Sequence, residues 1–258
     1  LCNLRCPGCP TGNQTNELPS GFMSFERFQR IIDSLADHLV LLGLDGIGEP
    51  TLNPDLWRQI AYAHQKGIGT QISSHLGTIK PADIPKVVDS GLDYLICSID
   101  GTTQDVYKQY RKGGDLDRVL EKLRAILEYR RTSGRKNPFI EFQFIRFPHN
   151  AHQEDAAREL AEALGVDRFL SKADGGVDLD SMGGDPATTE ARQIRLRKST
   201  CYWPWYLLTL NWSSGLNLCC ISLAKDVGLP EYDPDDFYAS WHHPRLVSTR
   251  ELLAHRIT

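Results

Sequence analysis

The amino-acid sequence predicts an α/β fold in which a partial (β/α)6 barrel carries a small C-terminal extension. Between Leu39 and Leu170, short apolar runs alternate with longer segments whose apolar residues recur at helical spacing. Alternation of this kind forms right-handed βαβ units around a parallel sheet. The length of 258 residues suits one main domain with an appendage, since single α/β barrel domains take about 200–250 residues.

Composition and charge argue against nucleic-acid and membrane partners. Hydrophobic residues make up 41% of the chain and charged residues 24%, which is ordinary for a soluble globular protein. The net charge is −4, with 29 basic and 33 acidic residues spread evenly. The apolar run Leu39–Leu44 is far too short to span a bilayer. No signal peptide precedes the N-terminal cysteines, so we expect a cytoplasmic protein.

The predicted elements begin with a helix over Met23–His38. Ser24 is a residue type that caps helix N-termini. The next segment, Leu39–Leu44, is apolar throughout, which is typical of a strand buried on both faces. The apolar residues that define the helix are Phe28, Ile31, Ile32 and Leu35.

Four more helices and four more strands continue the alternation to Leu170. We expect a sixth strand before Leu1, where it would support the N-terminal loop. The loops after parallel strands gather at one edge of the sheet, where α/β proteins bind ligands. Here these loops are Gly46–Pro50, Ser74–Thr78 and Ser98–Thr102. The helices cover Asp55–Lys66, Ile84–Ser90, Thr103–Arg131 with a break at Gly113-Gly114, and Gln153–Leu164, and the strands cover Gly69–Ser73, Tyr94–Ile99, Phe139–Ile145 and Asp167–Leu170.

The C-terminal part has a different character. Residues 171–200 are rich in Gly, Asp, Ser and Thr and are predicted to be a linker between residues 1–170 and residues 201–258. In the last region, two apolar runs flank Ser213-Ser214-Gly215 and predict a β-hairpin. The runs are Leu207–Trp212 and Leu216–Cys219, and short helices are predicted at Phe237–Trp241 and Pro244–Leu253.

Three cysteines lie within the first nine residues, as Cys2, Cys6 and Cys9 in a CxxxCxxC pattern. Three thiolates on one loop can hold an iron–sulfur cubane and leave its fourth iron open. Structural zinc sites usually have four ligands, and no partner CxxC or HxxxH follows. Seven cysteines, an odd number, argue against a disulfide framework. The pattern therefore favours an iron–sulfur site, with zinc or free thiols as alternatives.

The cysteine loop, Gly48-Glu49-Pro50 and Ser98-Ile99-Asp100-Gly101, taken in order, resemble the radical S-adenosylmethionine (radical SAM) superfamily. The resemblance implies that Cys2, Cys6 and Cys9 hold a [4Fe–4S] cluster whose fourth iron is chelated by the amine and carboxylate of SAM. It further implies that an electron from the cluster cleaves SAM to a 5′-deoxyadenosyl radical.

The same resemblance assigns the cofactor-binding residues. Gly48, Glu49 and Pro50 would face the SAM ammonium, Ser98 and Asp100 the ribose hydroxyls, and Arg111 the SAM carboxylate. Ser74 is a further cofactor-binding candidate. The alternatives are that Ser98 and Asp100 cap the following helix, that Arg111 is a solvated helix charge, and that Cys97 is a core thiol.

Two positions depart from the family pattern. Gly8 stands where relatives usually have a bulky residue before the third cysteine, and His75 stands where they often have Asn-Gly after the third strand. His75 therefore becomes a candidate for contact with SAM or substrate, although a structural histidine is an equal alternative. The candidate catalytic residues are His75, Gln143 and Arg146.

The second cysteine group resembles the SPASM or twitch extension, which holds an auxiliary cluster. The resemblance implies that Cys201 and Cys219, with Cys220 as the alternative to Cys219, bind a second [4Fe–4S] cluster. The family then supplies a CxxC, which is absent before Thr258. Either the chain is truncated or the auxiliary cluster is incomplete or absent. In the other interpretation, Cys219 and Cys220 fill a small core.

The sequence therefore predicts a radical SAM enzyme that abstracts a hydrogen atom from a substrate C–H bond in an oxidative modification, either a dehydrogenation or a cross-link. The resemblance implies a reducing partner such as flavodoxin or ferredoxin. We expect a small or carbohydrate-like substrate, with a ribosomal-peptide or protein maturase as the alternative. A non-catalytic iron–sulfur or zinc scaffold is the rival from another class.

Overall fold

The structure is a computed structural model that describes residues 1–13, 20–173, 202–218 and 229–254. The chain divides into two compact units. The first contains Leu1–Thr15 and Leu39–Asp178, and the second contains Asn16–His38 and Leu179–Thr258. The second unit thus includes an N-terminal helix as well as the C-terminal region. The boundaries 1–170, 171–200 and 201–258 stay a prediction.

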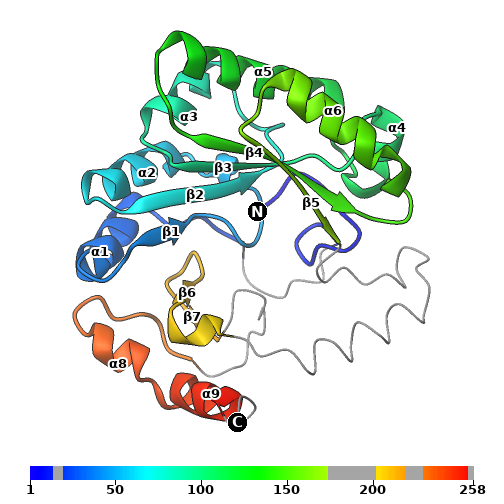
Figure 1. The fold of residues 1–258 in the computed structure, drawn as a ribbon. Coiled ribbons are helices and arrows are strands. Elements are labelled where there is room, and N and C mark those ends of the chain that lie inside the picture. Colours follow the sequence, from blue (N-terminus) through cyan, green and yellow to red (C-terminus); the bar gives the residue numbers. More distant parts are fainter. Residues whose placement is uncertain (14–19, 174–201, 219–228, 255–258) are drawn as a thin grey trace. The chain divides into compact units, whose positions relative to one another are not determined.

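The first unit is built on a five-stranded parallel sheet whose strands follow chain order (Figure 1). Helices alternate with the strands, which confirms the predicted α/β class. The strands are β1 (Leu41–Gly43), β2 (Gly69–Ser74), β3 (Tyr94–Ser98), β4 (Phe139–Arg146) and β5 (Arg168–Ala173). The α-helices are α2 (Leu56–Gln65), α3 (Ile84–Asp89), α4 (Gln104–Tyr110), α5 (Leu116–Thr132) and α6 (Glu154–Leu164), with short 3-10 turns at Pro50–Leu52, Pro81–Asp83 and Ala151–Gln153.

The first strand differs from its prediction. The apolar run Leu39–Leu44 was expected to be buried on both faces, but Val40 is 84% exposed and Leu41 is 57% exposed. The prediction is wrong here because, in the described part of the chain, β1 pairs only with β2 and forms an edge of the sheet. A central strand would have needed a partner on its other side.

The two faces of the sheet have opposite character, because side chains alternate along each strand. One face is apolar and packs against α2, α3, α5 and α6 to form the core, with Cys97 among its fully buried residues. The other face is polar, as shown by the Ser73–Ser98 and Tyr94–Glu141 hydrogen bonds across neighbouring strands. Parallel sheets are usually apolar on both faces. The polar face is therefore the one suited to a site.

The break between α4 and α5 follows from the glycine pair predicted to interrupt this helical region. Gly113 has φ +87°, a conformation that favours glycine. A Cβ on Gly114 would lie 2.7 Å from Cε1 of Tyr107. Asp115 then caps α5 by accepting a hydrogen bond from the Arg118 N–H. The break brings Arg111 to the end of α4 instead of the middle of a long helix.

The second unit contains α1 (Phe25–Leu35), and Ser24 accepts a hydrogen bond from the Arg27 N–H as its predicted N-cap. The predicted hairpin is also confirmed, as the antiparallel pair β6 (Thr209–Leu210) and β7 (Leu216–Asn217). A 3-10 turn (Trp203–Trp205) precedes the hairpin, and α8 (Phe237–Trp241) and α9 (Pro244–Ala254) follow it. Cys201, Cys219 and Cys220 lie outside the described residues. Within the described ranges, the helices are too short or too polar to cross a membrane.

Candidate functional site

The N-terminal cysteine loop is ordered by its own backbone. The Cys9 N–H donates to the Cys6 carbonyl oxygen at 3.1 Å, and the Leu4 N–H approaches Sγ of Cys2 at 3.4 Å. Cys6 is buried, whereas Cys2 and Cys9 are half-buried, and all three are free thiols. These hydrogen bonds fix the backbone of the loop that carries the three thiols, two of which are partly accessible.

Electrostatics around the loop are set by burial and by one cation. Burial raises the pKa of Cys6 to about 11, while the positive charge of Arg111 opposes this rise. Burial likewise raises the pKa of Cys2. The unliganded thiols of Cys2 and Cys6 are therefore protonated near neutral pH, and a metal group that binds them as thiolates must displace their protons.

The residues of the loop fit an iron–sulfur cluster. Among the described residues, no three His, Cys, Asp or Glu side chains converge closely enough to hold one metal ion. The thiolates of an iron–sulfur cluster each bind a different iron, so they need not converge on one point. The hydroxyl of Thr11 in the same loop is buried without a hydrogen-bond partner in the described structure. These features fit a polynuclear group seated in the loop.

Substitution of Gly12 is expected to disrupt this loop. A Cβ at Gly12 would lie 2.5 Å from the backbone nitrogen of Cys6 and 2.7 Å from its carbonyl oxygen. We expect Gly12→Ala to displace Cys6 and to lower the iron content per chain after anaerobic reconstitution. Gly134→Ala is the control, because Gly134 has φ +67° but nothing within 4 Å, and its strain of about 1–2 kcal/mol should leave iron binding intact. Equal iron contents in the two variants would contradict this expectation.

The turn Gly48-Glu49-Pro50 packs directly on the cysteine loop. The Glu49 N–H donates to the carbonyl oxygen of Leu1 at 2.8 Å. Gly48 has φ +100°, and a Cβ there would lie 2.4 Å from the same oxygen, so only glycine allows this approach. Pro50 begins the 3-10 turn that follows.

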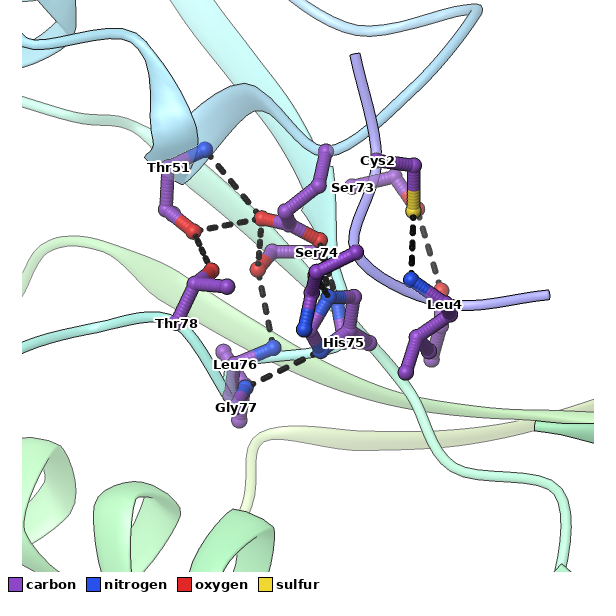
Figure 2. Close-up of polar contacts among 12 residues, drawn as sticks. Cys2, Leu4, Thr51, Ser73, Ser74, His75, Leu76, Gly77 and Thr78 are labelled. Atoms are coloured by element: carbon purple, nitrogen blue, oxygen red, sulfur yellow. Dashed lines mark hydrogen bonds and ion pairs between the residues drawn. The ribbon is translucent and has the colours of Figure 1, made fainter. Parts of the chain in front are cut away.

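The Glu49 carboxylate is buried and is held by groups from two loops. Its Oε1 accepts hydrogen bonds from the Thr51 N–H at 3.1 Å, the Thr51 hydroxyl at 2.6 Å and the Ser74 hydroxyl at 2.7 Å. Its Oε2 accepts one from the His75 N–H at 3.0 Å. The Thr51 hydroxyl also bonds that of Thr78, and Figure 2 shows these groups gathered at the end of β2. The carboxylate is therefore fixed in direction.

His75 joins this turn to the cysteine loop. Its Nε2 lies 2.9 Å from Oδ1 of Asn3 and 3.3 Å from Oε2 of Glu49, and its Nδ1 accepts from the Gly77 N–H at 3.1 Å. Burial lowers the pKa of His75, although the Glu49 carboxylate acts in the opposite direction. The ring is thus neutral near pH 7, and both of its nitrogens are engaged within the chain.

Asp100 and Arg111 form a buried ion pair. The Asp100 side chain is fully buried, and its Oδ2 accepts from Nε of Arg111 at 2.6 Å. Its Oδ1 accepts from the Ile145 N–H at 2.8 Å. Burial alone would lower the pKa of Arg111, but the Asp100 carboxylate raises it. Both carboxylate oxygens of Asp100 are therefore engaged, and the orientation of the guanidinium is fixed.

The remaining predicted residues lie on the sheet. Ser98 bonds Ser73 at 3.1 Å between their hydroxyls on the polar face. Gln143 accepts from Nζ of Lys172 at 2.6 Å, and Arg146 pairs with Glu154 at 3.4 Å. In the described structure, the side chains of Gln143 and Arg146 bond Lys172 and Glu154, whereas Ser74 bonds Glu49, whose N–H donates to Leu1.

Comparison with known proteins identifies the family. The model of the radical SAM superfamily matches residues 1–136. The chain belongs to the radical SAM superfamily. Enzymes of this superfamily use a [4Fe–4S] cluster and SAM. The five-stranded parallel sheet agrees with this membership.

Several radical SAM relatives are similar in sequence over part of their length. Mycofactocin maturase MftC of Mycobacterium ulcerans is 30% identical over 64% of this chain and 42% of its own. The tungsten-containing aldehyde ferredoxin oxidoreductase cofactor-modifying protein of Pyrococcus furiosus is 29% identical over 66% of this chain and 48% of its own. The PqqA peptide cyclase of Ruegeria pomeroyi is 31% identical over 65% and 43%. The chain thus spans less than half the length of these relatives.

Solved structures show the same fold at low identity. Streptococcus suis SuiB bound to S-adenosylmethionine has a TM-score of 0.68 at 15% identity, covering 96% of this chain and 65% of SuiB. BtrN in complex with AdoMet and 2-DOIA has a TM-score of 0.59 at 13% identity, covering 98% of this chain and 82% of BtrN. These similarities support the radical SAM fold.

Sequence reasoning missed two contributors to the site, Asn3 and Thr51. Asn3 lies between the first two cysteines and contacts His75, and Thr51 follows Pro50 and contacts Glu49. Their positions beside recognised motifs were the only signal available, because neither residue type is specific to a site. Their partners become visible only in the folded chain.

Proposed function

We propose that this protein is a radical SAM enzyme that abstracts a hydrogen atom from a substrate C–H bond. The proposal rests on one observation, that the cysteine loop is hydrogen-bonded at three points to Glu49, to the candidate His75 and to Lys112, which follows Arg111. The Leu1 carbonyl accepts from Glu49, Asn3 bonds His75, and the Arg5 N–H donates to the Lys112 carbonyl oxygen at 2.9 Å. A structural metal loop would have no need of these elements.

In this proposal each element has a separate task. Cys2, Cys6 and Cys9 hold the cluster, which together with bound SAM supplies a 5′-deoxyadenosyl radical. Glu49 receives the ammonium group of SAM, and Arg111 receives its carboxylate, since guanidinium pairs well with carboxylates. The two side chains carry opposite charges and are both fixed by neighbours, so they would orient a zwitterion without rearranging.

Further cofactor contacts are proposed at the strand ends. Ser98 ends β3 and Asp100 follows it, at the strand end where ligands bind in parallel α/β sheets, and both would lie toward the ribose. Ser74 would act through Glu49, to which its hydroxyl donates. Gly48 and Pro50 would shape the turn that presents Glu49.

The substrate is proposed to bind along the polar face of the sheet. That face carries Gln143, bonded to Lys172, which suits a polar substrate. A small or carbohydrate-like molecule and a peptide both meet this requirement. The second candidate substrate is a peptide, which is supported by the two relatives named as a maturase and a peptide cyclase. The reaction would be a dehydrogenation or a cross-link.

The proposed function is tested by anaerobic reconstitution of the chain with iron and sulfide, followed by SAM and dithionite. We expect 5′-deoxyadenosine to form. No product from a fully reconstituted protein would favour the rival scaffold role. In the cell we propose that the electron comes from a flavodoxin or ferredoxin in the cytoplasm.

We also propose a SPASM- or twitch-type auxiliary cluster bound by Cys201 and Cys219, with Cys220 as the alternative. Cys201→Ala should then leave SAM cleavage unchanged but stop substrate turnover, because the auxiliary cluster would accept the substrate electron. The measurement is 5′-deoxyadenosine and modified substrate in parallel, once a substrate is known. Loss of SAM cleavage equal to that of a Cys6 variant would contradict this separation of roles.

A further inference from the structure

Three segments distant in sequence meet at His75. The cysteine loop contributes Asn3, the turn before the first 3-10 segment contributes Glu49, and the end of β2 contributes His75 itself. The His75 side chain is 4% exposed and that of Glu49 is 2% exposed, so water competes little for these contacts. Figure 2 shows the ring of His75 between the Ser74–Gly77 turn and the cysteine loop.

The hydrogen-bond geometry fixes where the ring carries its proton. The Gly77 N–H can only donate, so Nδ1 of His75 acts as the acceptor. A neutral imidazole with an accepting Nδ1 carries its hydrogen on Nε2. This Nε2–H points toward two acceptors, Oδ1 of Asn3 at 2.9 Å and Oε2 of Glu49 at 3.3 Å. His75 is thus a donor shared between the cysteine loop and the buried carboxylate.

The backbone locks the ring in this direction. Leu76 is fully buried and has φ +62°, which is uncommon for a residue other than glycine. The Ser74 hydroxyl accepts from the Leu76 N–H at 2.9 Å while donating to Glu49. The turn and the carboxylate are therefore ordered together, and the ring cannot rotate without breaking several bonds.

We propose that His75 is a positioning residue whose Nε2–H ties Asn3, between Cys2 and Cys6, to the Glu49 carboxylate. The tie sets the distance between the cluster loop and the group that receives the SAM ammonium. The inference rests on the proposed function. It differs from a proton-transfer role, which would require His75 to give up one of its two engaged nitrogens.

The length of the side chain at position 75 determines which of the two ring hydrogen bonds a substituted residue can still make. An Asn side chain ends near the Nδ1 position, so it could still accept from Gly77 but could not reach Asn3. A Gln side chain extends to the Nε2 position and could still donate to Asn3. His75→Asn and His75→Gln therefore separate the two bonds of the ring.

The experiment uses the reconstituted holoenzyme and follows the electron paramagnetic resonance spectrum of the reduced cluster as SAM is added. We expect His75→Asn and Asn3→Ala to need about 3- to 10-fold more SAM for half-saturation of the spectral change, the effect of losing one hydrogen bond. His75→Gln should stay near the wild type. Iron per chain should match the wild type in all three variants.

Asn3→Ala tests the same contact with little risk of misfolding, because Asn3 is exposed and its truncation leaves the core intact. The double variant His75→Asn/Asn3→Ala should need no more SAM than His75→Asn alone, because His75→Asn has already lost the contact with Asn3. A wild-type SAM requirement in Asn3→Ala, or equal defects in His75→Gln and His75→Asn, would overturn the inference. Absence of any SAM-dependent change in the wild type would instead overturn the proposed function and this inference with it.

Discussion

Cys6→Ala is expected to reduce 5′-deoxyadenosine formation to the background level. Cys6 is the most buried of the three loop cysteines, at 5% exposure, and its backbone accepts the hydrogen bond that positions Cys9. A cluster held by three thiolates that loses one of them has two protein ligands and no defined open iron. Iron and sulfide content, together with 5′-deoxyadenosine yield after anaerobic reconstitution, measure the effect.

Cys97→Ala is the matched control for this prediction. Cys97 is also a buried free thiol, but it lies on the apolar face of β3, within the core. Its truncation should lower the free energy of unfolding through a small cavity and leave iron binding unchanged. Full iron content in Cys6→Ala, or a loss of iron in Cys97→Ala, would contradict the assignment of the cluster to the N-terminal loop.

Local patterns in the sequence predicted most helices and strands because each pattern reflects a local cause. Apolar spacing and the Ser24 cap located α1, and the Gly113-Gly114 pair located the end of α4. Strand ends were less accurate. The predicted strand Asp167–Leu170 became β5 at Arg168–Ala173, because its length is set by pairing with β4 as far as Arg146. The apolar run at β1 was wrongly expected to be buried on both faces. Burial of a strand depends on which strands lie beside it, and the run itself does not specify its neighbours.

The site was predicted in its parts but not in its connections. Motif resemblance pointed to Glu49 and Asp100, and a departure from the family pattern pointed to His75, each as a single residue. The bonds that join Glu49 to His75, and Asp100 to Ile145, link residues 26 and 45 positions apart. No periodicity encodes such pairs, since they depend on the sheet register. The polar face of the parallel sheet was likewise not expected, because parallel strands usually read as continuous apolar runs.

The second large effect is expected at the Asp100–Arg111 pair. Asp100→Ala should lower the free energy of unfolding by about 3–5 kcal/mol, the usual cost of removing one partner of a buried ion pair. The variant leaves the Arg111 guanidinium, whose side chain is 14% exposed, without its anion, and it leaves the Ile145 N–H without an acceptor. Urea unfolding of the wild type and the variant measures the difference.

A matched exposed pair separates burial from simple charge loss. Asp105 pairs with Lys108 at the surface, with side chains 85% and 55% exposed, and Asp105→Ala should leave stability almost unchanged. If Asp100 only faced the ribose of SAM, Asp100→Ala would weaken SAM binding, and its free energy of unfolding would equal that of Asp105→Ala. If Asp100 also orients Arg111, stability and SAM affinity should fall together. Equal stabilities of the two variants would therefore contradict a structural role for the ion pair.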